Sequence, residues 1–102
     1  MNENDIVFKS EDSMWQMLAS SEKTWDARRW DIDDPRILRL CKGHWVRYDN
    51  YKEWFFNERH VCFLNKATSE ILKMRFMGLN FVDFAPGWVF LKLGEIVERS
   101  HA

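Results

Sequence analysis

The chain has 102 residues, of which 46% are hydrophobic and 30% are charged, and its formal net charge is −1. This length suits one domain, so we expect a single domain over residues 1–102. With only two Cys, four Gly and two Pro, the composition excludes a disulfide-rich secreted scaffold and a fibrous chain. The sequence has no apolar run of the roughly 18 residues that span a membrane, and its polar start is unlike a signal peptide. These features predict a cytoplasmic protein without a membrane partner.

Aromatic content and charge distribution are the unusual features of the composition. Aromatic residues make up 16% of the chain, with six Trp and eight Phe, so we expect some rings to face a ligand or partner. Residues 1–34 carry a net charge of −5, residues 35–75 of +5 and residues 76–102 of −1. The near-neutral total argues against nucleic-acid binding by bulk charge, whereas the basic middle segment is compatible with a local binding patch or a solvated basic surface.

The first half of the chain is predicted to alternate short strands and short helices. In order, we expect a strand at residues 6–8, a helix at 10–19, a strand at 24–30, a helix at 35–40 and a strand at 44–48. Ser10 is the predicted N-cap of the first helix. Met14, Met17 and Leu18 share one helical face, which we expect to cover an opening of a barrel. Pro35 occupies the first position of the second helix.

The second half is predicted to be mostly strands. We expect a helical turn or an aromatic-rich loop at residues 49–58, a hairpin of residues 61–65 and 70–76 joined by a four-residue turn, and strands at 79–84 and 88–93. Leu72, Met74 and Phe76 alternate on one face of their strand. Together these elements predict an α+β fold built on a small mixed β-barrel with five or six strands and one or two short helices.

One predicted strand concentrates polar and aromatic side chains on a single face. A period of two places a hydroxyl, a carboxylate, a guanidinium and an indole together, from Thr24, Asp26, Arg28 and Trp30. Arginine can hold a phosphate through two hydrogen bonds, a carboxylate can accept from a base amino group, and an aromatic ring can stack on an unpaired base. The alternative interpretation is a surface ion pair between Asp26 and Arg28 beside a Trp30 that covers the core edge.

The same segment, residues 21–28 with Lys23-Thr24-x-Asp26-x-Arg28, resembles the signature of ASCH domains, which are small members of the PUA-like barrel superfamily. Residues 40–48 resemble the family's next element, a glycine turn that opens a strand, although His44 stands where the family usually has Asp. The resemblance implies a PUA-like barrel with an RNA- or nucleotide-binding cleft lined by the motif. The predicted nucleic-acid-binding residues are Lys23, Thr24, Asp26, Arg28, Trp30, Arg47, Tyr48 and Arg75.

The resemblance also raises the question of catalysis. Some ASCH-like proteins hydrolyse the amide of acetylated cytidine with a Lys, a second Thr and a downstream Glu, and ribonuclease activity has been attached to the family. Lys23, Thr24 and Asp26 are therefore the catalytic candidates. Asp26 replaces the second Thr and is expected to hold Lys23 charged, and the sequence shows no His pair with acid–base geometry. The candidates for the downstream Glu are Glu53, Glu58 and Glu70. We expect binding rather than catalysis, and no cofactor.

Residue spacing suggests one further class of site, a metal site. The pairs Cys41-x-x-His44 and His60-x-Cys62 contain zinc-ligand types, but the second pair is closer than structural zinc sites usually require, so we expect no metal.

An aromatic cluster lies between residues 45 and 56 and is interleaved with Arg47 and Lys52. Because Trp, Tyr and Arg are enriched at interface hot spots, the alternative function is a protein-interaction or inhibitor domain. The residues that would contact a protein partner are Trp45, Tyr51, Trp54 and Phe55.

Overall fold

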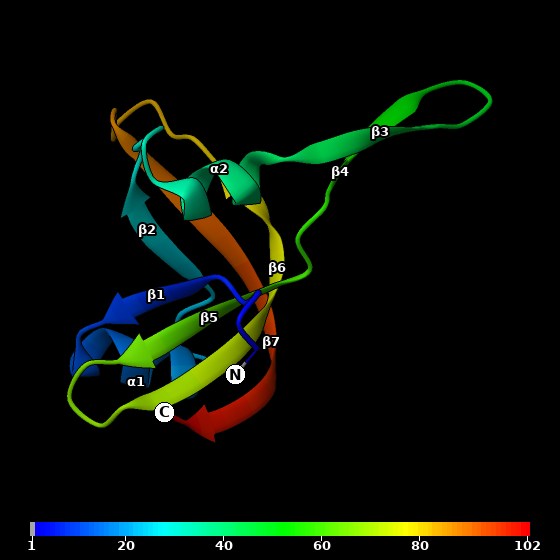
Figure 1. Ribbon diagram of the computed structural model, residues 1–102. Coiled ribbons are helices and arrows are strands. Elements are labelled where there is room, and N and C mark those ends of the chain that lie inside the picture. The colour runs from blue at the N-terminus through cyan, green and yellow to red at the C-terminus, as the bar shows by residue number, and fades with distance from the viewer. Residues whose placement is uncertain (1) are drawn as a thin grey trace.

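The computed structural model describes residues 2–102, which fold into a curled five-stranded sheet, a separate hairpin and two helices (Figure 1). The strands are β1 (Val7–Ser10), β2 (Trp25–Arg29), β3 (Gly43–Arg47), β4 (Lys52–Phe56), β5 (His60–Asn65), β6 (Glu70–Asn80) and β7 (Trp88–His101). The helices are α1 (Asp12–Ala19) and α2 (Pro35–Cys41). In the main sheet the order is β1-β5-β6-β7-β2, and only β1 and β5 run parallel. The predicted α+β class with a small mixed barrel-like sheet is confirmed.

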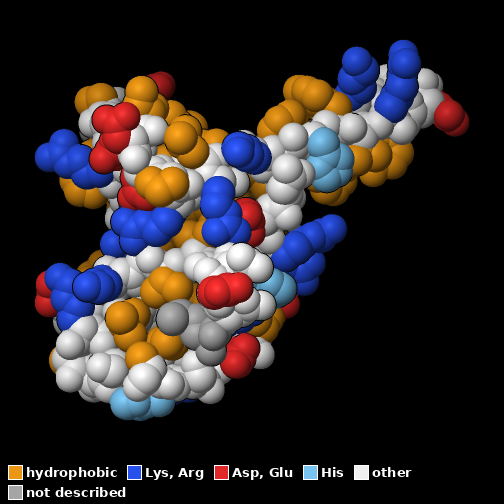
Figure 2. Space-filling view, in the orientation of Figure 1, with side chains coloured by type: hydrophobic (Ala, Val, Ile, Leu, Met, Phe, Trp, Pro, Cys, Tyr) orange, Lys and Arg blue, Asp and Glu red, His pale blue; other side chains and the backbone are white. Residues whose placement is uncertain are grey.

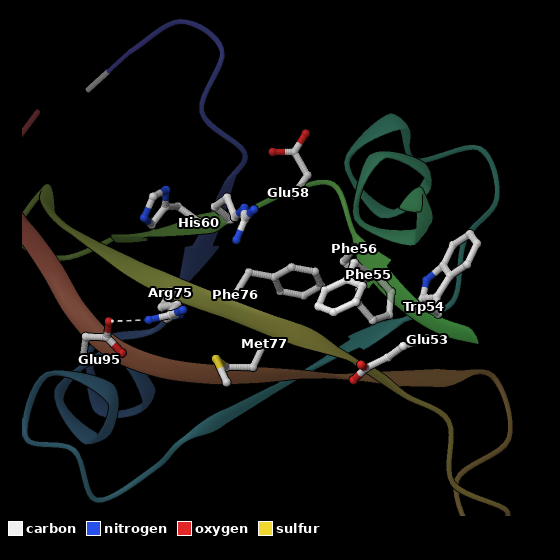
Figure 3. Close-up of a pocket in the computed structure, with 11 residues that line it drawn as sticks. Glu53, Trp54, Phe55, Phe56, Glu58, His60, Arg75, Phe76, Met77 and Glu95 are labelled. Atoms are coloured by element: carbon white, nitrogen blue, oxygen red, sulfur yellow. Dashed lines mark hydrogen bonds and ion pairs between the residues drawn. The ribbon is translucent and has the colours of Figure 1, made fainter. Parts of the chain in front are cut away.

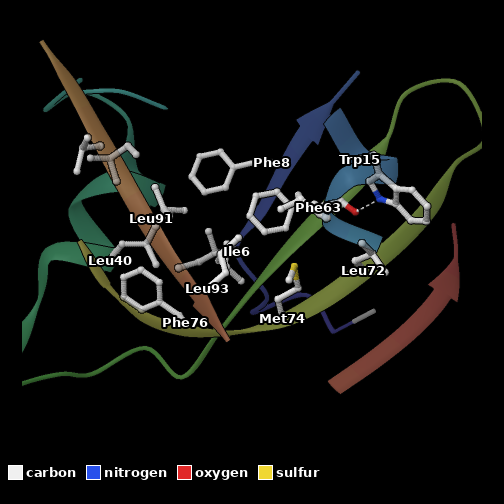
Figure 4. Close-up of a cluster of buried hydrophobic side chains, with 14 residues drawn as sticks. Ile6, Phe8, Trp15, Leu40, Phe63, Leu72, Met74, Phe76, Leu91 and Leu93 are labelled. Atoms are coloured by element: carbon white, nitrogen blue, oxygen red, sulfur yellow. Dashed lines mark hydrogen bonds between the residues drawn. The ribbon is translucent and has the colours of Figure 1, made fainter. Parts of the chain in front are cut away.

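The hydrophobic core lies inside the curl of the sheet (Figure 4). Its buried side chains are Ile6, Phe8, Trp15, Leu18, Ile37, Leu40, Val61, Phe63, Leu72, Met74, Phe76, Val89, Leu91 and Leu93. Within β5, β6 and β7 these positions are two residues apart, as expected when one face of a strand packs on the core. The face predicted from Leu72, Met74 and Phe76 is therefore confirmed as a core face.

Helix α1 packs through only part of the predicted face, because Leu18 is buried as expected but Trp15 takes the place of the two methionines. Trp15 and Leu18 are fully buried, whereas Met14 and Met17 are each 39% exposed. The Trp15 indole donates from Nε1 to the carbonyl of Phe63 at 2.9 Å, which satisfies its polar atom and allows the largest side chain of the helix to be buried. Ser10 is the last residue of β1, and Glu11 occupies the N-cap position without a side-chain capping bond, so the predicted Ser10 cap is wrong.

Leu18→Ala should lower the free energy of unfolding by about 2–5 kcal/mol, because it leaves a cavity in the core. Met14→Ala is the matched control in the same helix, with an expected change of about 0.5 kcal/mol or less. Urea denaturation of both variants measures the difference. Equal losses would show that α1 is not held to the sheet by Leu18.

Three boundaries in the second half differ from the prediction. Residues 52–56 form strand β4, paired with β3 so that Trp54 lies opposite Trp45; they form neither a helical turn nor a loop. Strand β6 is continuous through residue 80, with register shifts between Lys73 and Gly78, so the expected break before residue 79 and the strand expected at 79–84 are wrong. Strand β7 continues to His101, which pairs with Glu70.

The second helix follows the prediction. Helix α2 begins at Pro35, and the Asp34 carboxylate caps it by accepting from the backbone N–H of Arg36 at 2.9 Å. Neither helix in the described part of the chain is long and apolar enough to cross a membrane.

Candidate nucleotide-binding site at the open side of the half-barrel

Two arginines bind the edge strand β1 of the curled sheet, one from the other edge strand, β2, and one from helix α2. Arg28 on β2 donates from Nη1 to the carbonyl of Lys9 and from Nη2 to the Ser10 hydroxyl, each at 3.1 Å. Arg36 on α2 donates from Nη1 to the carbonyl of Val7 at 2.8 Å. Because an edge strand presents unpaired backbone groups, these bonds satisfy β1 and fix both guanidinium groups. The two groups lie 4.8 and 4.4 Å from the centre of the Phe8 ring.

A cavity of about 330 Å³, which we call the edge pocket, opens at this bridge. Its walls are formed by Phe8, Ala27, Arg28, Arg29, Asp31, Asp34, Arg36, Ile37 and Trp88. Arg36 is paired with Asp34 at 2.8 Å, and this hydrogen bond lowers the pKa of the Asp34 carboxyl. Arg29 lies 5.4 Å from the Trp88 ring and forms no salt bridge within residues 2–102. Among the described residues, the edge pocket thus has one cation without a salt bridge, Arg29, which lies over an exposed indole, and one carboxylate without a salt bridge, Asp31.

The half-buried Arg28 forms a charged triad with two buried residues, Asp26 and Lys23. Asp26 is 5% exposed and accepts from Nε of Arg28, while its other oxygen lies 3.9 Å from Nζ of Lys23. Lys23 is 4% exposed, and its Nζ has no hydrogen-bond partner among the described residues. That Nζ lies 4.5 Å from the centre of the Trp25 ring, a cation–π contact.

Burial has the largest effect on the pKa of the Lys23 amine. Desolvation lowers the pKa of its amine, and Arg28 lowers it further, whereas Asp26 raises it. The net direction is down, because the desolvation of a buried ammonium exceeds the attraction of one carboxylate. Asp26 therefore raises the pKa of Lys23 in the expected direction, but by less than burial lowers it.

The structure brings together only some of the residues predicted to bind nucleic acid. Lys23, Asp26 and Arg28 form the triad, but Thr24 precedes β2 and lines a different cavity of about 450 Å³ with Trp25 and Phe90. Trp30 follows β2 and packs edge-on against Phe81 at 5.1 Å. The alternation predicted for residues 24–30 applies only to the strand itself, which ends at Arg29.

The remaining members of the set lie elsewhere. Arg47 ends β3 and Tyr48 lies in the loop of the β3–β4 hairpin. Arg75 lies on β6, where it pairs with Glu95 at 3.3 Å. Conversely, the sequence reasoning missed Arg29, Arg36 and Trp88, which reach the edge pocket from β2, α2 and β7.

A larger cavity, of about 550 Å³, lies at the foot of the hairpin (Figure 3). Glu53 and Glu58 line it, and Glu58 pairs with Arg39 at 2.8 Å. Glu70 pairs with Arg99 at 3.3 Å. The three glutamates considered as partners of a catalytic lysine thus lie in other surroundings, and Asp26 is the carboxylate beside Lys23.

The cysteines have the environment of unreactive thiols. Both are free, and burial raises the pKa of Cys41 and raises that of Cys62 to about 11. Within residues 2–102, no three His, Cys, Asp or Glu side chains are grouped as metal ligands.

Comparisons with protein-family models, curated proteins and solved structures found no match to this chain. The resemblance of residues 21–28 to ASCH domains therefore stays a prediction.

Proposed function

We propose that the protein is an RNA- or nucleotide-binding domain of the ASCH-like, PUA-like type, and that the edge pocket holds one nucleotide unit. The observation that carries this proposal is the guanidinium of Arg29, which has no salt bridge among the described residues, beside the Trp88 indole. Arginine pairs with phosphate oxygens through charge-assisted hydrogen bonds, and an indole offers a face for stacking a base. A volume of about 330 Å³ is within the range of small-ligand pockets.

Arg28 and Arg36 are held in place by bonds within the protein, so they shape the edge pocket and do not offer free hydrogen-bond donors of the kind that Arg29 has. Their backbone and carboxylate bonds hold them at the wall of the edge pocket, so their positive ends contribute a fixed potential there. Asp26 and Asp34 compensate these two charges in the absence of ligand. A phosphate would consequently be recognised mainly by Arg29.

Arg29→Ala should weaken binding of a ten-residue oligouridylate by about 1.5–3 kcal/mol, because it removes a charge-assisted hydrogen bond. The dependence of log affinity on log salt should also become shallower by about 0.7, the value for one phosphate contact to a single strand. Fluorescence titration at several salt concentrations measures both quantities.

Arg99→Ala is the control, because Arg99 pairs with Glu70 near the end of β7 and is absent from the edge pocket. It should leave affinity and salt dependence unchanged. Equal losses for the two variants, or no binding by the wild type at low salt, would contradict a nucleotide site at the edge pocket.

The buried amine of Lys23 favours a second candidate, hydrolysis of a modified nucleoside. A lowered pKa is what a lysine needs to act as a base or nucleophile. Asp26 in place of the second Thr of the ASCH-like hydrolases ranks this candidate below binding. Release of cytidine from the acetylated nucleoside by the wild type, and its loss in Lys23→Met, would establish the second candidate.

A further inference from the structure

The β3–β4 hairpin projects from the half-barrel as an arm (Figure 1). Its own pairs hold it together, since Trp45 and Trp54 meet edge-on at 5.3 Å and Tyr48 stacks on Tyr51 at 4.7 Å. An isolated two-stranded hairpin is only marginally stable in water. We therefore expect another molecule to bind the exposed rings of the arm and stabilise it.

The two faces of the arm differ in charge. Cross-strand partners point to the same side, so the pairs Trp45–Trp54 and Arg47–Lys52, which are two positions apart, share a face. We call this the tryptophan face. The hairpin strands place no carboxylate on it, because Glu53 pairs with Val46 on the opposite face.

The groups on the tryptophan face are available for binding. Trp45 is 63% exposed and Trp54 is 39% exposed. Neither Arg47 nor Lys52 forms a salt bridge with any residue that the structure describes. The face therefore combines two aromatic surfaces with two cations that form no salt bridge among the described residues.

We propose that the tryptophan face binds the single strand of a nucleic acid that continues from the edge pocket, with bases against Trp45 and Trp54 and phosphates against Arg47 and Lys52. The inference rests on the proposed nucleotide function and extends it from one nucleotide to a strand. Indoles beside cations are the combination by which proteins bind single strands without reading their sequence. The charged residues that the two strands place on this face are all positive, which favours a polyanion over a protein occupant.

Helix α2 connects the two sites. Its first turn forms part of the edge pocket through Arg36 and Ile37, and its last residue is followed within two positions by β3. Lys42 and Arg39, which pairs with Glu58, lie along this connection. Patches of Lys and Arg side chains lie on this face of the body and at the tip of the arm (Figure 2). Seven helical residues span only about 10 Å, so a strand of several nucleotides can reach from the pocket to the arm.

The test compares a short probe with a long one. Trp45→Ala should weaken binding of a ten-residue oligouridylate by roughly 5- to 150-fold, the range for loss of one base stack, and leave binding of uridine monophosphate unchanged. Trp45→Phe keeps a ring and should retain most of the affinity. Phe55→Ala is the matched control, since Phe55 stacks with His44 on the opposite face.

The variant Arg47→Ala/Lys52→Ala should reduce the salt dependence for the long probe by about 1.4, corresponding to two phosphate contacts. Circular dichroism at the aromatic wavelengths checks that the hairpin of each variant is intact. Equal effects of Trp45→Ala and Phe55→Ala on the long probe would overturn the proposal.

The outcomes separate the arm from the edge pocket. If the long probe binds no tighter than the monophosphate, the arm proposal fails while the edge pocket stands. If the long probe depends on Trp45 but not on Arg29, the pocket fails while the arm stands. If Trp45→Ala turns a dimer into a monomer in sedimentation and leaves the long probe's affinity unchanged, the arm is an interface between two copies and the proposal is overturned.

Discussion

Asp26→Ala should lower the free energy of unfolding by about 3–5 kcal/mol, the cost of removing one partner from a buried ion pair. Asp26 is the only carboxylate that pairs with Lys23 or Arg28 in the described chain. Its loss would leave a buried ammonium with no compensating charge and would free the Arg28 side chain that bridges β2 to β1. Urea denaturation at neutral pH measures the change.

The matched control is Asp34→Ala. Asp34 also pairs with an arginine, but its side chain is more exposed, and it caps α2. Loss of such a cap costs about 1 kcal/mol. Adding Lys23→Met to Asp26→Ala should restore part of the lost stability, because the uncompensated charge is then absent. A loss no greater than that of Asp34→Ala would contradict a stabilising triad.

The pH dependence of the Asp26→Ala variant has a defined sign. In the folded protein the pKa of Lys23 is already lowered by burial, and without Asp26 nothing in the triad raises it. Between this lowered pKa and the ordinary pKa of lysine, the unfolded chain binds more protons than the folded one, so stability rises with pH. The stability of Asp26→Ala should therefore recover as the pH increases through this interval, and Lys23→Met should abolish the recovery.

The position of the triad could be predicted, but its burial could not. Strand alternation correctly places Asp26 and Arg28 on one side of β2. Whether a strand's polar face meets solvent or the interior depends on the curl of the sheet, which residues distant in sequence determine. The same limit explains why Arg29 was missed: its place beside Trp88 follows from the pairing of β2 with β7.

The arm shows a second limit of local sequence patterns. Its aromatic content is evident from the sequence, but residues 52–56 have no alternation between polar and apolar side chains. Such alternation arises when one face packs on a core, and both faces of this hairpin are largely exposed. The order in the arm lies in its cross-strand pairs, such as Trp45 opposite Trp54, and this register is known only from the structure.

Gly78→Ala should lower the free energy of unfolding by about 2–6 kcal/mol, because two separate costs add at this position. Gly78 has φ of +126°, where an L residue is strained by about 1–3 kcal/mol. A Cβ there would lie 2.8 Å from the ring of Phe56, which forms the foot of the arm and packs on Phe76 at 5.5 Å. Displacing a packed ring costs about another 1–3 kcal/mol.

Gly87→Ala separates the two costs. Gly87 also has a positive φ, +82°, but a Cβ there would meet nothing within 4 Å. The loss of stability in Gly87→Ala should therefore reflect backbone strain alone, about 1–3 kcal/mol. The excess for Gly78→Ala should shrink when Phe56→Leu is added, since the smaller side chain makes room for the methyl group. Denaturation of Gly78→Ala, Gly87→Ala, Phe56→Leu and the double variant gives this comparison. An unchanged excess in the double variant, measured against Phe56→Leu, would show that Gly78 does not position the arm through Phe56.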